Sequence, residues 1–88
     1  MADAWNNRGA AHLEAGRPDQ AVRDCTQAIE LAPDFGPAYR NRAVGFLATK
    51  AFDKAWHAVK MCEKLGYGVD ATLLKELSAA SPPLPRSP

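Results

Sequence analysis

Hydrophobic and small residues recur three or four positions apart along most of the chain, which is the spacing of amphipathic helices. The first predicted helix runs from about residue 3 to residue 15, and Gly16 ends it because glycine takes the left-handed conformation without a Cβ penalty. Pro18 suits the first turn of a second helix, where its missing N–H would have no partner anyway. Pro33 ends this second helix, whose predicted apolar face consists of Ala21, Val22, Cys25, Ala28, Ile29 and Leu31.

The same arrangement returns 34 residues later. When residues 2–35 are aligned with residues 36–69, small residues fall on small residues and aromatic residues on aromatic ones. The identical pairs are Ala4/Ala38, Asn7/Asn41, Arg8/Arg42, Leu13/Leu47, Asp19/Asp53, Ala21/Ala55 and Leu31/Leu65. A fixed period within about 20 to 50 residues indicates stacked supersecondary units. The sequence therefore predicts two helix-turn-helix units. Lys50 stands where the first unit has Gly16, which predicts a slightly strained or differently shaped turn.

These units resemble the tetratricopeptide repeat (TPR), whose pattern is W-x2-L-G-x2-Y, then A-x3-F, then A, then P. The matching positions are Trp5, Gly9, Ala21, Ala28 and Pro33 in the first unit and Tyr39, Ala43, Phe46 and Ala55 in the second. The departures are Arg8, His12 and Cys25 in the first unit and Arg42, Val59, Cys62 and Tyr67 in the second. The resemblance covers residues 2–69 and implies an all-α fold, an α-solenoid of two TPR units.

Residues 70–80 are predicted to form a helix that caps the open end of the stack, since repeat arrays need a terminal element with a polar outer face. Asp70 is the predicted N-cap of this helix. Leu73, Leu77 and Ala80 fall on one stripe that would cover the second unit. The predicted domain is therefore residues 2–80, followed by a proline-rich, disordered tail over residues 81–88.

Composition and charge narrow the possible functions. The 88 residues hold 11 basic and 10 acidic side chains, and this near-neutral balance gives no electrostatic footprint for nucleic acid or an anionic membrane. The longest apolar stretch, residues 43–48, is far shorter than the roughly 20 residues that span a bilayer. The first residues lack a basic region followed by an apolar core, so we expect no secretory signal and a cytoplasmic protein.

Candidate chemistry is sparse, and we expect neither an enzyme nor a cofactor or metal. His12 takes the place of a packing aromatic residue, and neither it nor His57 has a ligand at the i+3 or i+4 spacing of a metal site. Cys25 and Cys62 are predicted to be inert core thiols. Arg8 and Arg42 recur at the repeat period, which favours a structural role: their stems would cover apolar surface and their heads would reach acids or carbonyls of the neighbouring helix.

The resemblance implies that the first helix of each unit lines a concave face, which holds a peptide or helix of a partner protein. By register, the predicted peptide-binding residues are Asp3, Asn6, Asn7, Ala10, Leu13, Arg40, Asn41, Val44, Leu47, Leu74 and Lys75, with Ser78 beside them. Asparagine amides can donate to and accept from a peptide backbone, and Arg40 offers a fork for a carboxylate. Family members that clamp chaperone tails use a set of residues of which only Asn41 is matched well, so we expect no high-affinity binding of such tails.

Two alternatives stay open. The chain could self-associate into a homodimer or larger scaffold through an uncovered edge of the stack, because three or more repeats are usual for stability and this chain has two units and a cap. The tail segment Pro82-Pro83-Leu84-Pro85 resembles a ligand of WW domains, and Ser81-Pro82 and Ser87-Pro88 resemble proline-directed phosphorylation sites.

Overall fold

The computed structural model describes residues 1–81, which form five helices and no strand. The helices are α1 (Ala2–Glu14), α2 (Pro18–Leu31), α3 (Gly36–Ala48), α4 (Phe52–Lys64) and α5 (Ala71–Ala80). The predicted all-α fold of two helix-turn-helix units and a further helix is confirmed. Here α1 and α2 are called unit one, and α3 and α4 unit two. The predictions for the tail from residue 82 onward lie outside the described residues.

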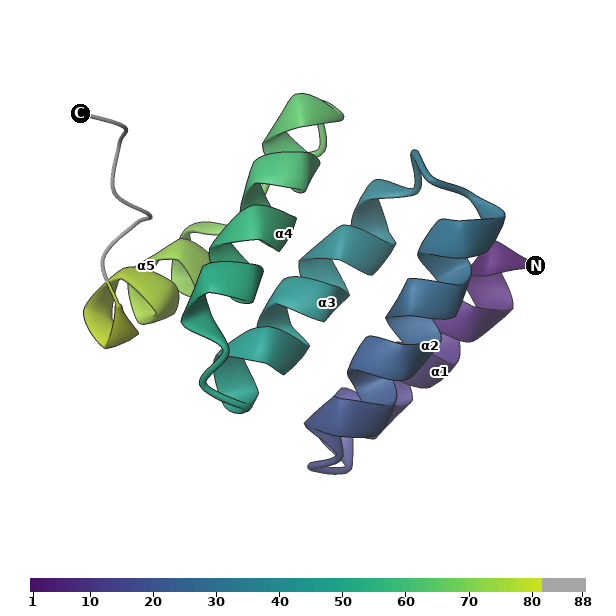
Figure 1. Ribbon diagram of the computed structural model, residues 1–88, viewed down its shortest axis with the longest axis horizontal. Helices are drawn as coiled ribbons and strands as arrows, with labels where there is room; N and C mark the ends of the chain where they lie inside the picture. Colours follow the sequence, from purple (N-terminus) through teal and green to yellow (C-terminus); the bar gives the residue numbers. More distant parts are fainter. Residues whose placement is uncertain (82–88) are drawn as a thin grey trace.

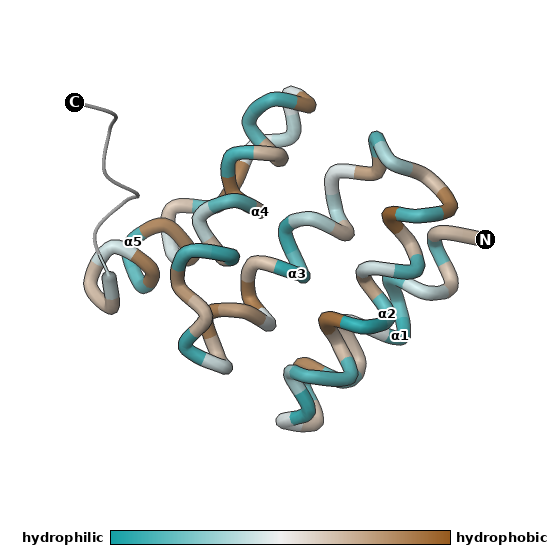
Figure 2. Tube along the Cα trace, viewed as in Figure 1, coloured by the Kyte–Doolittle hydropathy of each residue, from teal (hydrophilic) through white to brown (hydrophobic). Residues whose placement is uncertain are grey.

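The helices stack in chain order (Figure 1). Helix α1 lies against α2, and α3 lies between α2 and α4, while α5 lies beside α4 at the end opposite to the N-terminus. Figure 2 shows hydrophobic and hydrophilic residues mixed along every helix, as expected for helices that each turn one side to their neighbours.

The same turn closes α1, α3 and α4. After α1, Gly16 N–H donates to Leu13 C=O at 3.1 Å and Arg17 N–H donates to His12 C=O at 2.8 Å, the paired bonds of a Schellman motif. Equivalent bonds follow α3 and α4, and the residue in the left-handed conformation is Gly16 (φ 76°), Lys50 (φ 64°) or Gly66 (φ 77°). Lys50 therefore keeps the shape of the turn and bears the backbone strain, so of the two expectations for this turn the strained one is right.

Small residues set the close approach of the helices. Ala21, Cys25 and Ala28 of α2 have no exposed surface, and the matching residues of α4, Ala55 and Cys62, have none either. A Cβ placed on Gly9 would lie 2.9 Å from Cys25 Sγ, and one placed on Gly45 would lie 2.7 Å from Val22 Cγ2. Both distances are shorter than normal packing allows, so the glycines let α1 and α3 approach α2 closely.

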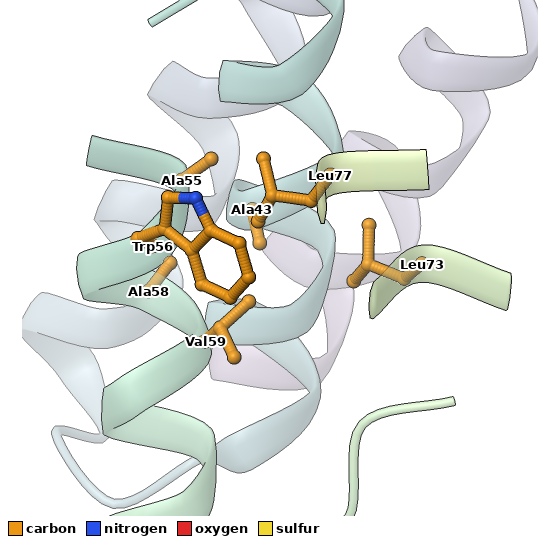
Figure 3. Packing of buried hydrophobic residues seen from close by; sticks show 7 residues of the cluster. All are labelled: Ala43, Ala55, Trp56, Ala58, Val59, Leu73 and Leu77. Carbon is orange, nitrogen blue, oxygen red and sulfur yellow. The ribbon is translucent and has the colours of Figure 1, made fainter. Parts of the chain in front are cut away.

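Helix α5 covers unit two as the sequence predicts. Asp70 Oδ2 accepts a hydrogen bond from Leu73 N–H at 3.3 Å, which makes Asp70 the N-cap. Leu73 and Leu77 are buried, and Figure 3 shows their side chains on the side of Ala43, Trp56 and Val59. Trp56 Nε1 donates to Ser81 C=O at 3.3 Å and ties α4 to the end of α5.

Two details of the predicted apolar faces are wrong. Ala80 shares the stripe of Leu73 and Leu77 but is exposed, so only the first two turns of the stripe are covered. Leu31 is 55% exposed, because it lies about a quarter turn away from the stripe of Ala21, Cys25 and Ala28.

Candidate functional site

The predicted peptide-binding residues lie on α1, α3 and α5, and we call this set the α1–α3–α5 surface. Their side chains differ in exposure. Asp3, Asn7 and Lys75 are exposed, and the partly buried members are Ala10, Leu13, Arg40, Asn41, Val44, Leu47 and Leu74. Asn6 is 9% exposed, so little of its amide faces solvent. Val44, Leu47 and Leu74 also pack against the core of unit two, so they serve the fold as well as the surface.

A chain of hydrogen bonds crosses this surface and links the three helices. Asn41 Nδ2 donates to Asn6 Oδ1 at 2.9 Å, which joins α3 to α1. Arg40 Nη1 donates to the oxygen of Asn41 at 3.3 Å, and Arg40 Nε donates to Asp70 Oδ1 at 3.1 Å. The carboxylate of Asp70 therefore caps α5 with one oxygen and holds Arg40 with the other.

The charge of Asp70 is stabilised by this arrangement. The hydrogen bond from the Arg40 side chain, with smaller contributions from the Arg40 charge and from nearby backbone N–H groups, lowers the pKa of the Asp70 carboxyl below its usual 3.8. Asp70 and Arg40 are thus a fixed ion pair at neutral pH, and both side chains keep part of their surface in solvent.

The structure changes how the predicted ligands can act. The fork of Arg40 already holds a carboxylate of the same chain, so a partner's carboxylate must use its remaining N–H groups or displace Asp70. The pairing of Arg40 with Asp70 was missed in the sequence because Asp70 was considered only as an N-cap. The repeat register contains a signal: the two residues are 30 positions apart, which is one repeat of 34 less about one helical turn.

The two repeated arginines, Arg8 and Arg42, behave differently. Arg8 Nε lies 3.0 Å from Asp24 Oδ2 of α2, and His12 Nε2 lies 3.4 Å from the same oxygen, so Arg8 reaches an acid of the neighbouring helix as predicted. Arg42 does not. Its guanidinium lies over the Phe46 ring at 5.2 Å, and its Nε is buried with no hydrogen-bond partner among the described residues. The prediction is wrong for Arg42 because Ala58 stands at the position that corresponds to Asp24.

The cysteines are buried and free, and the structure gives them no activating environment. Burial raises the pKa of the Cys25 thiol to about 11, with the Asp24 carboxylate adding to the rise. Burial likewise raises the pKa of Cys62 to about 11, and its Sγ lies 3.8 Å from Gly36 C=O. Both thiols are therefore protonated and weakly nucleophilic at neutral pH. Within residues 1–81 no group of three His, Cys, Asp or Glu side chains could hold a metal ion.

Comparison with known proteins identifies the family of unit one. Residues 2–35 match the family described as the tetratricopeptide repeat, and these residues contain α1 and α2. Residues 2–35 are therefore a TPR unit, and the resemblance recognised in the sequence is confirmed for unit one. Such repeats generally mediate protein–protein interaction and are not themselves catalytic.

Two curated relatives contain a similar segment. The Heat shock protein sti1 homolog of Schizosaccharomyces pombe is 46% identical over 39 residues, and the DnaJ homolog subfamily C member 7 homolog of Dictyostelium discoideum is 41% identical over 39 residues. Each match covers 44% of this chain and 7% of the relative, so the likeness is to one segment of much longer proteins. In the part of the chain that the structure describes, no helix is long and apolar enough to cross a membrane.

Proposed function

We propose that this protein is a non-catalytic interaction module that binds an extended peptide or a helix of a partner protein on the α1–α3–α5 surface. The observation that supports this most is the chain of hydrogen bonds from Asn6 to Asp70, which holds polar groups of three helices on one surface. A peptide laid across this surface would meet fixed donors and acceptors, so little side-chain entropy is lost when it binds.

The groups left over for a partner are specific. Asn41 uses one of its two N–H donors on Asn6, and Arg40 uses Nε and Nη1 within the chain, which leaves further N–H groups on both residues. The exposed amide of Asn7 and the ammonium of Lys75 flank them, and Leu13 and Leu47 are partly exposed beside them. This pattern suits a peptide with backbone carbonyls facing the amides and one or two apolar side chains.

We expect modest affinity and no tight binding of chaperone tails. The surface is short, and small interfaces of this size bind weakly, at about micromolar Kd. The names of the two relatives refer to heat-shock and DnaJ proteins, but in this chain Asn6 is nearly buried and Arg40 is paired with Asp70, which leaves few cations free for an acidic tail on the α1–α3–α5 surface. The cytoplasmic location and the lack of binding to nucleic acid or membrane stay predictions from the sequence.

The test is a selection of peptides followed by calorimetry. Peptides selected from a random 12-residue library would be titrated into the parent protein, into Asn7→Ala and Arg40→Ala, and into the control Lys60→Ala on the exposed side of α4. We expect at least a tenfold loss of affinity in the two variants of the α1–α3–α5 surface and no change in the control. Equal affinity in all four proteins would contradict the proposed surface.

Self-association is a second candidate, and one observation favours it. Ala38 is fully buried and Gly45 is packed against Val22 of α2, whereas their counterparts on α1, Ala4 and Ala11, are exposed. That side of α1 is where a preceding unit would lie in a longer stack. Light scattering over about a hundredfold range of concentration would show a rising molar mass if copies of the chain pair there, and a constant monomer mass would exclude this candidate.

A further inference from the structure

The two units differ at one buried polar position. In unit one, Asp24 is 5% exposed and its Oδ2 lies between Arg8 Nε and His12 Nε2, at 3.0 and 3.4 Å. In unit two the arginine returns as Arg42, but Ala58 replaces the aspartate and Phe46 replaces the histidine. The repeat therefore keeps the cation and removes the carboxylate that neutralises it.

A cavity of about 300 Å³ lies at this place in unit two, between α3 and α4. Its apolar lining consists of Tyr39, Phe46, Ala58 and Met61, and its polar lining consists of Arg42, Lys54 and His57. The lining thus contains two cations and no acidic residue. The phenol of Tyr39 is held in place, since its O–H donates to Pro33 C=O at 2.9 Å.

Arg42 lacks a partner at the atom that unit one uses. Its Nε is buried and has neither a hydrogen-bond partner nor an ion pair among residues 1–81. Arg8 Nε, in contrast, forms an ion pair with Asp24 Oδ2, although the geometry of that contact is not that of a hydrogen bond. The Lys54 ammonium is 5.8 Å from the centre of the Phe46 ring, which Arg42 also approaches, and neither cation forms an ion pair with a described acidic side chain. A buried N–H without an acceptor is costly, so the site favours a ligand that brings one.

We propose that this cavity binds an aspartate or glutamate side chain of a partner protein, whose carboxylate takes the place that Asp24 fills in unit one. The carboxylate accepts from Arg42 Nε and is attracted by Lys54, and the charge-assisted bond is stronger than a bond to a neutral acceptor. The apolar walls from Phe46, Ala58 and Met61 cover the methylene groups of the side chain or an adjoining apolar residue. The ion pair of Arg8 and Asp24 in unit one is therefore the model for the contact between Arg42 and the partner's carboxylate in unit two.

This site is distinct from the α1–α3–α5 surface. At about 100° per residue, Tyr39, Arg42 and Phe46 lie on the side of α3 opposite to Asn41 and Val44. Figure 1 shows α3 between α2 and α4, and the cavity lies on the side of α3 that faces α4. A partner could therefore occupy either site alone, and the failure of one proposal would leave the other standing.

The experiment uses two blocked peptides, acetyl-Ala-Leu-Asp-Leu-Ala-amide and its asparagine analogue, and follows the side-chain Nε–H signals of the arginines by ¹H–¹⁵N NMR. We expect the aspartate peptide to move the Arg42 Nε–H signal downfield in a saturable way, because that proton gains an acceptor. We expect the asparagine peptide to need at least tenfold higher concentration for the same shift. Equal responses to both peptides would overturn the proposal.

Three variants sharpen the result. Ala58→Asp supplies the carboxylate of unit one from within the chain, so we expect it to abolish the response to the peptide. Lys54→Ala changes an exposed residue that does not support the core, and we expect it to weaken binding several-fold. The control Lys60→Ala, on the exposed side of the same helix, should bind as the parent does.

Four other outcomes would contradict the proposal. A full response in Ala58→Asp would show that the peptide does not enter the cavity. Shifts confined to amides of the α1–α3–α5 surface would assign the peptide to the other site. An Arg42 signal that moves with protein concentration alone would identify a second copy of the chain as the occupant. Tighter binding of a phosphoserine peptide than of the aspartate peptide would assign the site to phosphate.

Discussion

Unit one and unit two have the same helix-turn-helix backbone and differ in whether one arginine is neutralised within the chain. In unit one Arg8 reaches Asp24 within the chain, and the place between the two helices is filled by an ion pair. In unit two Arg42 keeps its position but Ala58 leaves a cavity beside it. Small residues at matching positions set the helix packing in both units, and the difference between Asp24 and Ala58 is the basis of our proposal that unit two is open to a ligand.

The largest loss of stability is expected from a substitution in the contact between α5 and unit two. Leu77 is fully buried, so Leu77→Ala removes buried methyl groups and leaves a cavity, which should lower the free energy of unfolding by about 3 kcal/mol. Thermal or urea unfolding measures this loss. The control Ala80→Ser, on the same stripe but exposed, should change stability by less than about 0.5 kcal/mol. An unchanged melting curve for Leu77→Ala would mean that α5 does not cap the stack.

The second-largest loss of stability is expected from a substitution that makes unit one resemble unit two. Asp24→Ala removes the carboxylate between Arg8 and His12 and should destabilise the protein by about 2 kcal/mol, less than for a fully buried pair because the Arg8 side chain is 64% exposed and can rehydrate. Urea unfolding gives the value. The matched change Ala58→Asp places a carboxylate beside Arg42, and we expect it to leave stability equal or higher. A strong loss in Ala58→Asp would show that unit two cannot hold a carboxylate there.

A smaller change of stability is expected from substitutions in the turn between the two helices of each unit. Lys50 has φ 64°, a conformation that costs a residue with a Cβ about 1 kcal/mol, so Lys50→Gly should stabilise the protein by roughly 0.5 to 1 kcal/mol. The reverse change in unit one, Gly16→Lys, should destabilise it by a similar amount. Melting temperatures of the two variants test this. A shift in the same direction for both would contradict the equivalence of the turns.

The smallest expected effect is a dependence of the protein's stability on pH. The folded state lowers the pKa of Asp70 below its usual 3.8, so the ionised form is favoured by folding and its contribution is present above about pH 4. That contribution is lost as the pH falls through the lowered pKa. Arg40→Gln removes the main cause of the shift, so the variant should melt below the parent at pH 6, and the difference should shrink as the pH falls below about 4. A difference that stays constant as the solution is acidified would show that Arg40 stabilises the fold by another route.

Local signals were sufficient to predict most of the fold. Gly16, Pro18 and Pro33 mark helix ends through their own backbone preferences, and the register of 34 residues located the units. The capping helix could be predicted from Asp70, Leu73 and Leu77. What could not be predicted depends on packing between distant segments. One example is Tyr67, which replaces the proline of the family pattern: a Cβ placed on Gly36 would lie 2.6 Å from the Tyr67 side chain, so the two residues are in close contact.

The candidate site was predictable only in part. The register placed the predicted residues on α1, α3 and α5, but whether a polar side chain faces solvent or another side chain depends on distances that a sequence does not contain. Asn6 is held by Asn41, and Arg40 by Asp70, for this reason. The contrast between Arg8 and Arg42 depends on Asp24 and Ala58, which lie on the second helix of each unit and not beside the arginines in the sequence.

One NMR measurement tests the difference between the units most directly. The side-chain Nε–H protons of Arg8, Arg40 and Arg42 can be assigned in a single ¹H–¹⁵N spectrum of the free protein. We expect the Arg40 proton to lie downfield because it donates to Asp70, and the Arg8 proton to lie downfield of Arg42 because Arg8 Nε is 3.0 Å from an Asp24 carboxylate oxygen. The Arg42 proton should lie upfield of both. In Ala58→Asp the Arg42 proton should move downfield to join them. An Arg42 proton that is already as far downfield as that of Arg8 in the parent protein would contradict the open site in unit two.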